Sequence, residues 1–168
     1  GSWGRQEPSF LSDQDNAIIW SDTESGSGEK EWLLEFGKRV CTDIDQLGYP
    51  FCNGENMAMN PQWIRSLDEW KDLFQSWIVN PEVDEILRIM IFFDFRSIYG
   101  DSGLAEELRS EILAETPGRP VFLWNLAQGC LNYKIRSAAE GDLFDAKQAL
   151  RPVIDYARLQ ALSHGIRE

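Results

Sequence analysis

The chain has 168 residues, of which 43% are hydrophobic and 12% aromatic, and its formal net charge is −12. This apolar content predicts a folded protein and argues against a disordered one. The acidic balance argues against a nucleic-acid polymer as a partner, because phosphate backbones are bound by basic surfaces. We expect neither a membrane span, since no apolar run approaches ~20 residues, nor a signal peptide.

The three cysteines, Cys41, Cys52 and Cys130, are an odd number and lack the paired spacing of a zinc site. Disulfides are rare in the reducing cytoplasm. We therefore expect reduced thiols and a cytoplasmic protein.

Residues 1–12 predict a loop with one helical turn, which Pro8 interrupts. Asp13 and Asp15 follow, and residues 15–20 predict a buried strand. Because successive side chains of a strand point to opposite faces, the two aspartates are expected to point the same way. Two carboxylates on one face can hold Mg²⁺, which prefers oxygen ligands and often shares them with substrate phosphates. The alternative is a pair of solvated turn acids ahead of a strand.

The small residues at the start of the chain, Gly1 and Ser2, offer backbone N–H groups and a hydroxyl that suit a phosphate. Arg5 is a candidate for a bidentate phosphate contact, because its guanidinium presents a fork of donors. Residues 21–28 predict a flexible loop, which either covers a nucleotide or only connects two elements.

The middle of the chain alternates helices with short extended segments. A helix is predicted from 29 to 47, with Gly48 as its stop. A short strand is expected at 55–59, paired with the first strand, and a turn at 60–63. Ser66 and the glutamate three residues later form a capping box, which predicts the start of the next helix.

A further helix is predicted from Pro81 to about Tyr99, and its apolar run marks it as the central buried helix. Asp94 and Arg96 lie inside this stretch, where charged residues are rarely buried without a partner. Either Asp94 faces a nucleotide pocket or Arg96 contacts phosphates, or each pairs with a residue of another helix. Residues two apart on a helix do not face each other, so they are not expected to pair together.

The C-terminal half predicts helices joined by short links, which is typical of an antiparallel bundle. Asp101 or Ser102 is expected to cap its first helix. That first helix is predicted to end near 115. Further helices are predicted at 121–133, 144–150 and 153–163, and residues 134–145 are polar. The chain is thus predicted to be α+β and predominantly helical, with a small sheet packed against an antiparallel helical bundle.

The order of the motifs resembles a known family. Gly-Ser, a spacer and Asp-Gln-Asp entering a strand resemble the DNA polymerase β-type nucleotidyltransferase superfamily. The fuller string, Gly-Ser-x-Gly-Arg-x-Glu and then Ser-Asp-Gln-Asp-Asn-Ala, is similar to bacterial nucleotidyltransferases related to the uridylyltransferase of the PII signalling protein. The further strings that fit this group lie at 48–52, 60–63, 66–70, 92–96, 100–101 and 152–158.

The resemblance implies a nucleotidyltransferase-like domain over residues 1–65 and a helical substrate-binding domain over 66–168. The first is expected to be N-terminally incomplete, because the resembled fold has a helix and a strand ahead of Gly1. The implied reaction transfers NMP from an NTP to a hydroxyl of a protein or small molecule, with Mg²⁺ or Mn²⁺ as cofactor.

The resemblance also assigns roles to residues. Asp13 and Asp15 are the implied catalytic residues and metal ligands, and the implied nucleotide-binding residues are Gly1, Ser2 and Arg5. The third carboxylate is open between Glu55 and Asp94, and Arg96 is a candidate phosphate contact.

Two functions from different classes remain open. Retention of both aspartates favours an enzyme, whereas the unsettled third carboxylate favours a catalytically inactive module that binds nucleotide or another protein and regulates. The expected partners are a nucleotide and a protein acceptor. A sheet without its first strand has an open edge that can pair with a second copy, so a homo-oligomer is also expected.

Overall fold

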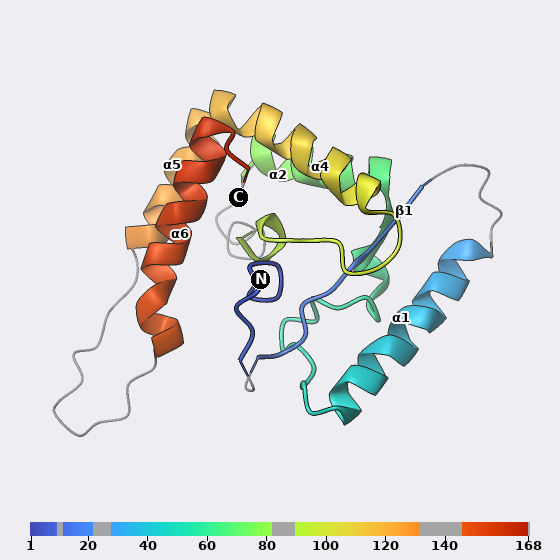
Figure 1. Cartoon of the computed structure of the whole chain (residues 1–168). Coiled ribbons are helices and arrows are strands. Elements are labelled where there is room, and N and C mark those ends of the chain that lie inside the picture. Colours follow the sequence, from blue (N-terminus) through green and yellow to red (C-terminus); the bar gives the residue numbers. More distant parts are fainter. Residues whose placement is uncertain (10–11, 22–27, 82–89, 132–145, 168) are drawn as a thin grey trace, which may run out of the picture. The chain divides into compact units, whose positions relative to one another are not determined.

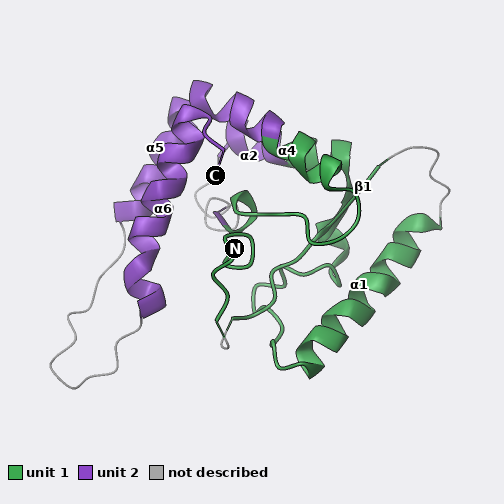
Figure 2. Cartoon of the chain, in the orientation of Figure 1, with its two compact units in different colours: residues 1–73, 91–109 green, residues 74–90, 110–168 purple. Residues whose placement is uncertain are grey.

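The computed structural model describes residues 1–9, 12–21, 28–81, 90–131 and 146–167 (Figure 1). This part of the chain is predominantly helical α+β with a small parallel sheet, which confirms the predicted fold class. It packs into two compact units, residues 1–73 with 91–109 and residues 74–90 with 110–168 (Figure 2). Within the described ranges, no helix is long and apolar enough to cross a membrane.

The sheet has two strands, β1 (Ile18–Trp20) and β2 (Ile64–Ser66), which pair in parallel with Ile18 opposite Ile64. Parallel neighbours need a long crossover, and α1 (Glu29–Gln46) lies within it. Trp70 Nε1 donates to the Ile18 carbonyl oxygen at 3.0 Å, which ties the start of the following helix to β1.

The strand predicted at 55–59 is wrong, because this segment turns. Glu55 N donates to the Cys52 carbonyl at 3.0 Å, and Glu55 has a φ of 55°, outside the strand region. Asn53 and the glycine after it favour such a turn. The segment still contacts the approach to β1, since Asn16 N donates to the Asn56 carbonyl at 3.1 Å.

The partner of β1 instead follows a short 3₁₀ helix, η1 (Pro61–Trp63), where the sequence predicted a turn. The side chain of Asn60 caps this helix by accepting from Gln62 N at 3.0 Å. β2 comes directly after it, and Ile64 is fully buried. The 3₁₀ turn therefore sets the point at which the chain enters the sheet.

An aromatic cluster joins residues 91–109 to residues 1–73. The rings of Trp63 and Phe92 lie 4.3 Å apart between centroids, and those of Trp70 and Phe92 lie 5.8 Å apart. All three side chains are buried. Aromatic pairs of this kind contribute about 0.5–1.5 kcal/mol beyond their buried area. The cluster places the residues that follow Phe92 beside the beginning of the chain.

The helix predicted from 81 to about 99 ends earlier, at Phe93. Residues 90–93 are helical and residues 94–99 are not, while 82–89 lie outside the described residues. Asp94 therefore does not sit on a helix, and neither does Arg96. The Asp94 carbonyl accepts from the Gly1 nitrogen at 2.8 Å, so the start of the chain occupies a backbone acceptor that a continued helix would have used.

The second unit is built from helices. The C-terminal part of α4 (Ser102–Glu115) leads through η2 (Thr116–Gly118) to α5 (Pro120–Leu131), which packs on α6 (Ala146–His164). The buried hydroxyl of Thr116 donates to the Leu162 carbonyl at 2.9 Å. The two helices expected at 144–150 and 153–163 are one helix from Ala146, and the polar segment 134–145 lies outside the described residues.

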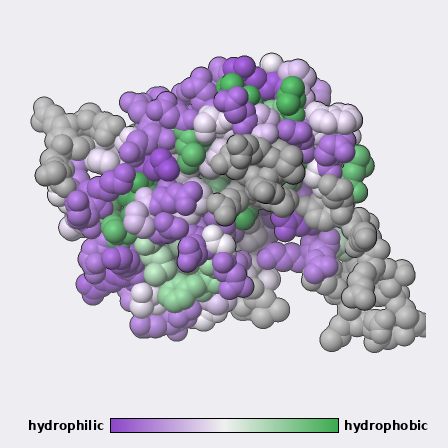
Figure 3. Space-filling view, turned by 180° about the vertical axis from the view of Figure 1, so that it is seen from behind, coloured by the Kyte–Doolittle hydropathy of each residue, from purple (hydrophilic) through white to green (hydrophobic). Residues whose placement is uncertain are grey.

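The surface seen in Figure 3 is largely hydrophilic, and hydrophobic side chains break it only in small separate groups. This agrees with a chain whose formal net charge is −12.

The capping box at the start of α2 (Leu67–Val79) forms as predicted. Ser66 N donates to Glu69 Oε2 at 2.9 Å, and Glu69 N donates to Ser66 Oγ at 3.2 Å. The hydrogen bond from the Ser66 backbone lowers the pKa of the Glu69 carboxyl, and Lys30 and Arg65 add to this against the effect of burial.

Glu69→Ala should lower the free energy of unfolding by about 0.5–1 kcal/mol at pH 7, because the Ser66 N–H loses its acceptor. Since the folded pKa is lowered, the contribution of Glu69 is present above its ordinary pKa of 4.5 and is lost as pH falls through the lowered value. Urea unfolding across this pH range should show the deficit of the variant shrinking with acidity.

The control is Glu35→Ala, which removes a carboxylate that is 80% exposed from α1. Its effect should be smaller at neutral pH. A deficit for Glu69→Ala that does not change with pH would show that the negative charge is not what stabilises the start of α2.

Candidate active site

The first seven residues form hydrogen-bonded turns within the loop that the sequence predicted. Gly4 N and Arg5 N both donate to the Gly1 carbonyl, at 3.1 and 3.4 Å, and Glu7 N donates to the Ser2 carbonyl at 2.9 Å. We call residues 1–7 the N-terminal loop. Its backbone bonds hold Gly1 and Ser2 in a fixed position relative to the rest of the turn.

Two glycines let the N-terminal loop approach its neighbours closely. A Cβ on Gly4 would lie 1.8 Å from the Asp94 carbonyl oxygen, and a Cβ on Gly1 would lie 2.5 Å from Asp15 Oδ2. Both distances are far below van der Waals contact, so a side chain at either position would displace the loop or its neighbour. The loop thus lies between the backbone of residue 94 and the carboxylate of Asp15.

A buried ion pair fixes the same loop. Arg5 Nη1 bonds to the Asp94 carboxylate, whose side chain is 2% exposed, and Arg5 Nε donates to Glu7 Oε2 at 2.9 Å. Burial alone would lower the pKa of Arg5, but the hydrogen bonds and charges of Glu7 and Asp94 raise it overall. The guanidinium therefore stays charged, and its partner is a carboxylate outside any helix.

Trp3 links the N-terminal loop to the aspartate segment. Its Nε1 donates to the Asp13 carbonyl at 2.9 Å, and its ring meets the Tyr49 ring edge-on with centroids 5.1 Å apart. Arg96 Nε donates to the Trp3 carbonyl at 3.0 Å. The sequence reasoning did not single out Trp3, although an aromatic residue in a small-residue turn was a signal that it packs on something.

The residues that follow each aspartate, Gln14 and Asn16, hydrogen bond to the backbone of other segments. Gln14 is 2% exposed, and its Nε2 donates to the carbonyls of Cys41 at 3.0 Å and Tyr49 at 2.9 Å. Asn16 Oδ1 accepts from Ala58 N at 2.8 Å. Because Gln14 and Asn16 make these bonds on one side of the chain, Asp13 and Asp15 lie together on the opposite side, as the alternation predicted. This holds although β1 begins only at Ile18.

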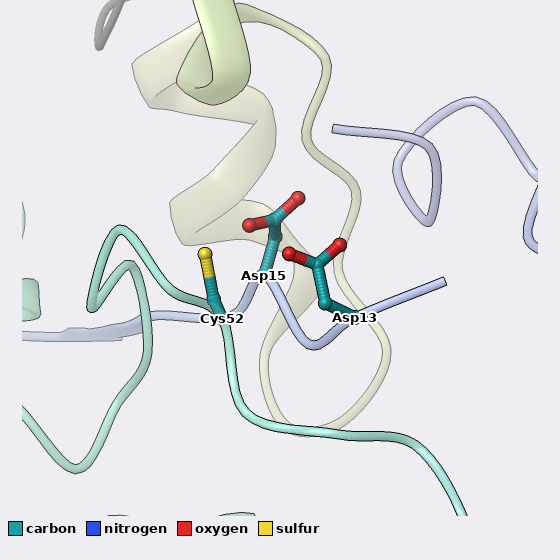
Figure 4. Close-up of side chains that lie close together, drawn as sticks. All are labelled: Asp13, Asp15 and Cys52. Carbon is teal, nitrogen blue, oxygen red and sulfur yellow. The ribbon is translucent and has the colours of Figure 1, made fainter. Parts of the chain in front are cut away.

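Asp13 and Asp15 converge with a third side chain, Cys52 (Figure 4). One carboxylate oxygen from each aspartate and the Cys52 sulfur all lie within 4.8 Å of one another. Cys52 is buried, whereas Asp13 and Asp15 are partly exposed. Burial raises the pKa of the Cys52 thiol, the nearby charge of Asp15 raises it further, and backbone N–H groups of Asn56 and Gly54 oppose the rise.

Neither candidate for the third carboxylate joins this group among the described residues. Glu55 is exposed on its turn, where its carbonyl accepts from Trp63 Nε1 at 2.8 Å. Asp94 is bound to Arg5. The structure instead brings in Cys52, which the sequence analysis treated as a reduced thiol and as the end of the family-like string 48–52, with no role at the site. Nothing in the linear spacing relates it to the aspartates.

The family model described as "Putative nucleotidyltransferase DUF294" matches residues 1–84, which is half of the 168-residue chain. The chain belongs to this nucleotidyltransferase family. The matched stretch contains the N-terminal loop, both aspartates and Cys52, whereas Asp94 and Arg96 lie outside it. Comparison with curated proteins and with solved structures finds no match.

The site fits the divalent cation that nucleotidyltransferases use. Asp13 and Asp15 supply two carboxylate oxygens, the donor type that Mg²⁺ prefers. Gly1 lies directly against the Asp15 carboxylate, since a Cβ there would lie 2.5 Å from Oδ2. The chemistry of the donors therefore suits such an ion.

Gly4→Ala should destabilise the chain by about 1–3 kcal/mol, because the added methyl group overlaps the Asp94 backbone and the loop must shift. Chemical denaturation monitored by tryptophan fluorescence checks this. The matched control is Gly28→Ala ahead of α1, where a Cβ meets nothing within 4 Å, and its effect should stay within about 0.5 kcal/mol. Equal effects of the two variants would contradict the close approach at Gly4.

Proposed function

We propose that the chain transfers a nucleoside monophosphate from an NTP to a hydroxyl group of a protein or small molecule, in the manner of PII uridylyltransferase. The observation that carries the proposal is the convergence of Asp13 and Asp15 beside Gly1, in a chain that belongs to a nucleotidyltransferase family. Such a pair next to the glycine that begins the N-terminal loop suits a triphosphate bound through a shared cation.

In this proposal Asp13 and Asp15 hold Mg²⁺ or Mn²⁺, and the bound ion supplies charge stabilisation to the attacking and leaving oxygens of the phosphoryl group. Gly1 and Ser2 lie at the start of the N-terminal loop and contact the phosphates of the NTP. Gln14 and Asn16 act indirectly, because their hydrogen bonds to the core keep the aspartates on one side.

Arg5 was predicted to contact phosphate directly. Its guanidinium already bonds to Asp94 and Glu7, so we propose that Arg5 supports binding mainly by holding the loop in place. A direct contact would require it to leave Glu7, whose side chain is 55% exposed. Arg96 donates to a neutral carbonyl of the same loop and stays a candidate for phosphate binding.

We propose that residues 66–168 present the acceptor, and that a cytoplasmic protein or small molecule fills this role. The net charge of −12 favours a neutral or basic acceptor over an acidic one. We propose a preference for UTP from the resemblance to the uridylyltransferase. We propose a homo-oligomeric assembly from the short sheet.

A second candidate function is a regulatory module that binds nucleotide without transferring it. The observation that favours it is the absence of a third carboxylate from the group formed by Asp13 and Asp15 in the described part of the chain. Without that ligand the site can hold an ion and still activate an attacking hydroxyl poorly.

Asp13→Asn should weaken Mg²⁺-dependent binding of a non-hydrolysable NTP by at least about tenfold, as expected when a metal ligand is lost. Calorimetric titration with ATP, UTP, CTP and GTP analogues measures this and identifies the preferred base. The control is Asp43→Asn, which removes the same charge from an exposed position on α1 and should leave binding unchanged.

Transfer of label from an α-labelled NTP to candidate acceptors then separates the two functions. Metal-dependent binding with transfer supports the enzyme. Metal-dependent binding without transfer to any acceptor supports the regulatory module. A folded chain that binds no nucleotide in the presence of Mg²⁺ would overturn both.

A further inference from the structure

Cys52 gives the aspartate pair a ligand of a different chemical kind. Its sulfur lies within 4.8 Å of a carboxylate oxygen of both Asp13 and Asp15. It comes from the turn after residue 51, far from the aspartates in sequence. Mg²⁺ is not bound by sulfur ligands, because it is a hard cation that prefers oxygen ligands.

The turn that carries Cys52 directs a hydrogen-bond donor at the sulfur. Asn56 Nδ2 donates to it at 3.8 Å, and both side chains are buried. Glu55, in the same turn, has a positive φ of 55°. A hydrogen bond to the sulfur orients it as a metal ligand. This contact comes from Asn56 and is independent of the aspartates.

The spacing of the three ligands is close to that of a bound zinc ion. Zinc bonds of about 2.0–2.3 Å place neighbouring ligands of a tetrahedron about 3.5 Å apart. Ligand atoms that start within 4.8 Å of one another need only a small inward movement to reach this arrangement. Thiolate with carboxylate is a donor set that zinc and cobalt accept.

We propose that Asp13, Asp15 and Cys52 bind a divalent cation of the zinc class, in competition with Mg²⁺. On binding, a sulfur–metal bond forms, the thiol proton leaves to solvent, and a fourth position stays open for water. The ion occupies both carboxylates that hold Mg²⁺, so it arrests transfer. This inhibitory consequence rests on the proposed function, whereas the metal site itself does not.

Co²⁺ tests the site directly, because a cobalt–thiolate bond gives a charge-transfer absorption band in the near ultraviolet that oxygen ligands alone do not give. Titration of the full chain with Co²⁺ alone should produce this band at one equivalent, and Zn²⁺ should abolish it by displacement. Cys52→Ser should remove the band. The matched control Cys130→Ser, at a cysteine on α5, should retain it.

Substitution of an aspartate gives a second test of the proposed metal site. Loss of a hydrogen-bonding partner of a metal ligand already weakens binding by about 10–100-fold, so Asp15→Asn should weaken Co²⁺ binding by at least that much. A band that survives in Cys52→Ser, or an unchanged Co²⁺ affinity in Asp15→Asn, would overturn the proposed site. Circular dichroism of each variant reports whether it is folded.

Alkylation of the unmutated chain keeps the test independent of variants. Zn²⁺ should slow modification of Cys52 by iodoacetamide at least about tenfold and leave that of Cys130 unchanged, as read by peptide mass mapping. Equal rates with and without Zn²⁺ would overturn the proposal.

The two proposals fail separately. A cobalt–thiolate band in a chain that binds no NTP analogue supports the zinc-class site and overturns the transferase. Mg²⁺-dependent NTP binding without any band leaves the proposed function standing and overturns the role of Cys52.

Discussion

The candidate site depends on the contact between the N-terminal loop and Asp94. Gly4 packs directly on the Asp94 backbone, and Arg5 pairs with the buried Asp94 carboxylate. A buried carboxylate is costly unless it is paired, so this pair favours one position of the loop over alternatives. The aromatic cluster around Phe92 brings residue 94 to that place. Asp94, which lies outside the group formed by the two aspartates and Cys52, thereby decides where Gly1 lies relative to Asp15.

A second set of polar contacts places the other half of the site. Gln14 and Asn16 bond to backbone groups of Cys41, Tyr49 and Ala58, so the aspartate segment and the turn with Cys52 share one core. These bonds satisfy buried backbone groups that no strand pairing covers. Breaking one of these hydrogen bonds leaves a buried polar group unsatisfied, which destabilises the fold by about 1–3 kcal/mol. The loop, the aspartates and Cys52 thus come from three stretches that are held by hydrogen bonds more than by sheet structure.

The parts of the fold that could be predicted are those that local chemistry decides. The capping box of Ser66 and Glu69, the bounds of α1 and the common side of Asp13 and Asp15 all follow from neighbours in sequence. The partner of β1 could not be predicted in this way, because 55–59 and Ile64–Ser66 are both short, and a turn with a positive φ at Glu55 rules out the first. Helical spacing also did not reveal which face of α1 is buried: Gly37 and Cys41 face the core, whereas Trp32 is 65% exposed. Cys52 and Asp94 are positioned by contacts with residues distant in sequence, so local patterns could not place them.

Charge explains why a cation is central to any nucleotide site here. Asp13 and Asp15 bring two negative charges to the point where a triphosphate would add more, in a chain of net charge −12. Arg5 brings no surplus positive charge, because it faces both Asp94 and Glu7. Like charges at such distances repel by several kcal/mol in a partly buried site, about 4 kcal/mol at 4 Å for an effective dielectric constant of 20. Under the proposed function, nucleotide binding at these residues is therefore coupled to a divalent cation, and the ion held by the two carboxylates decides what the site can bind.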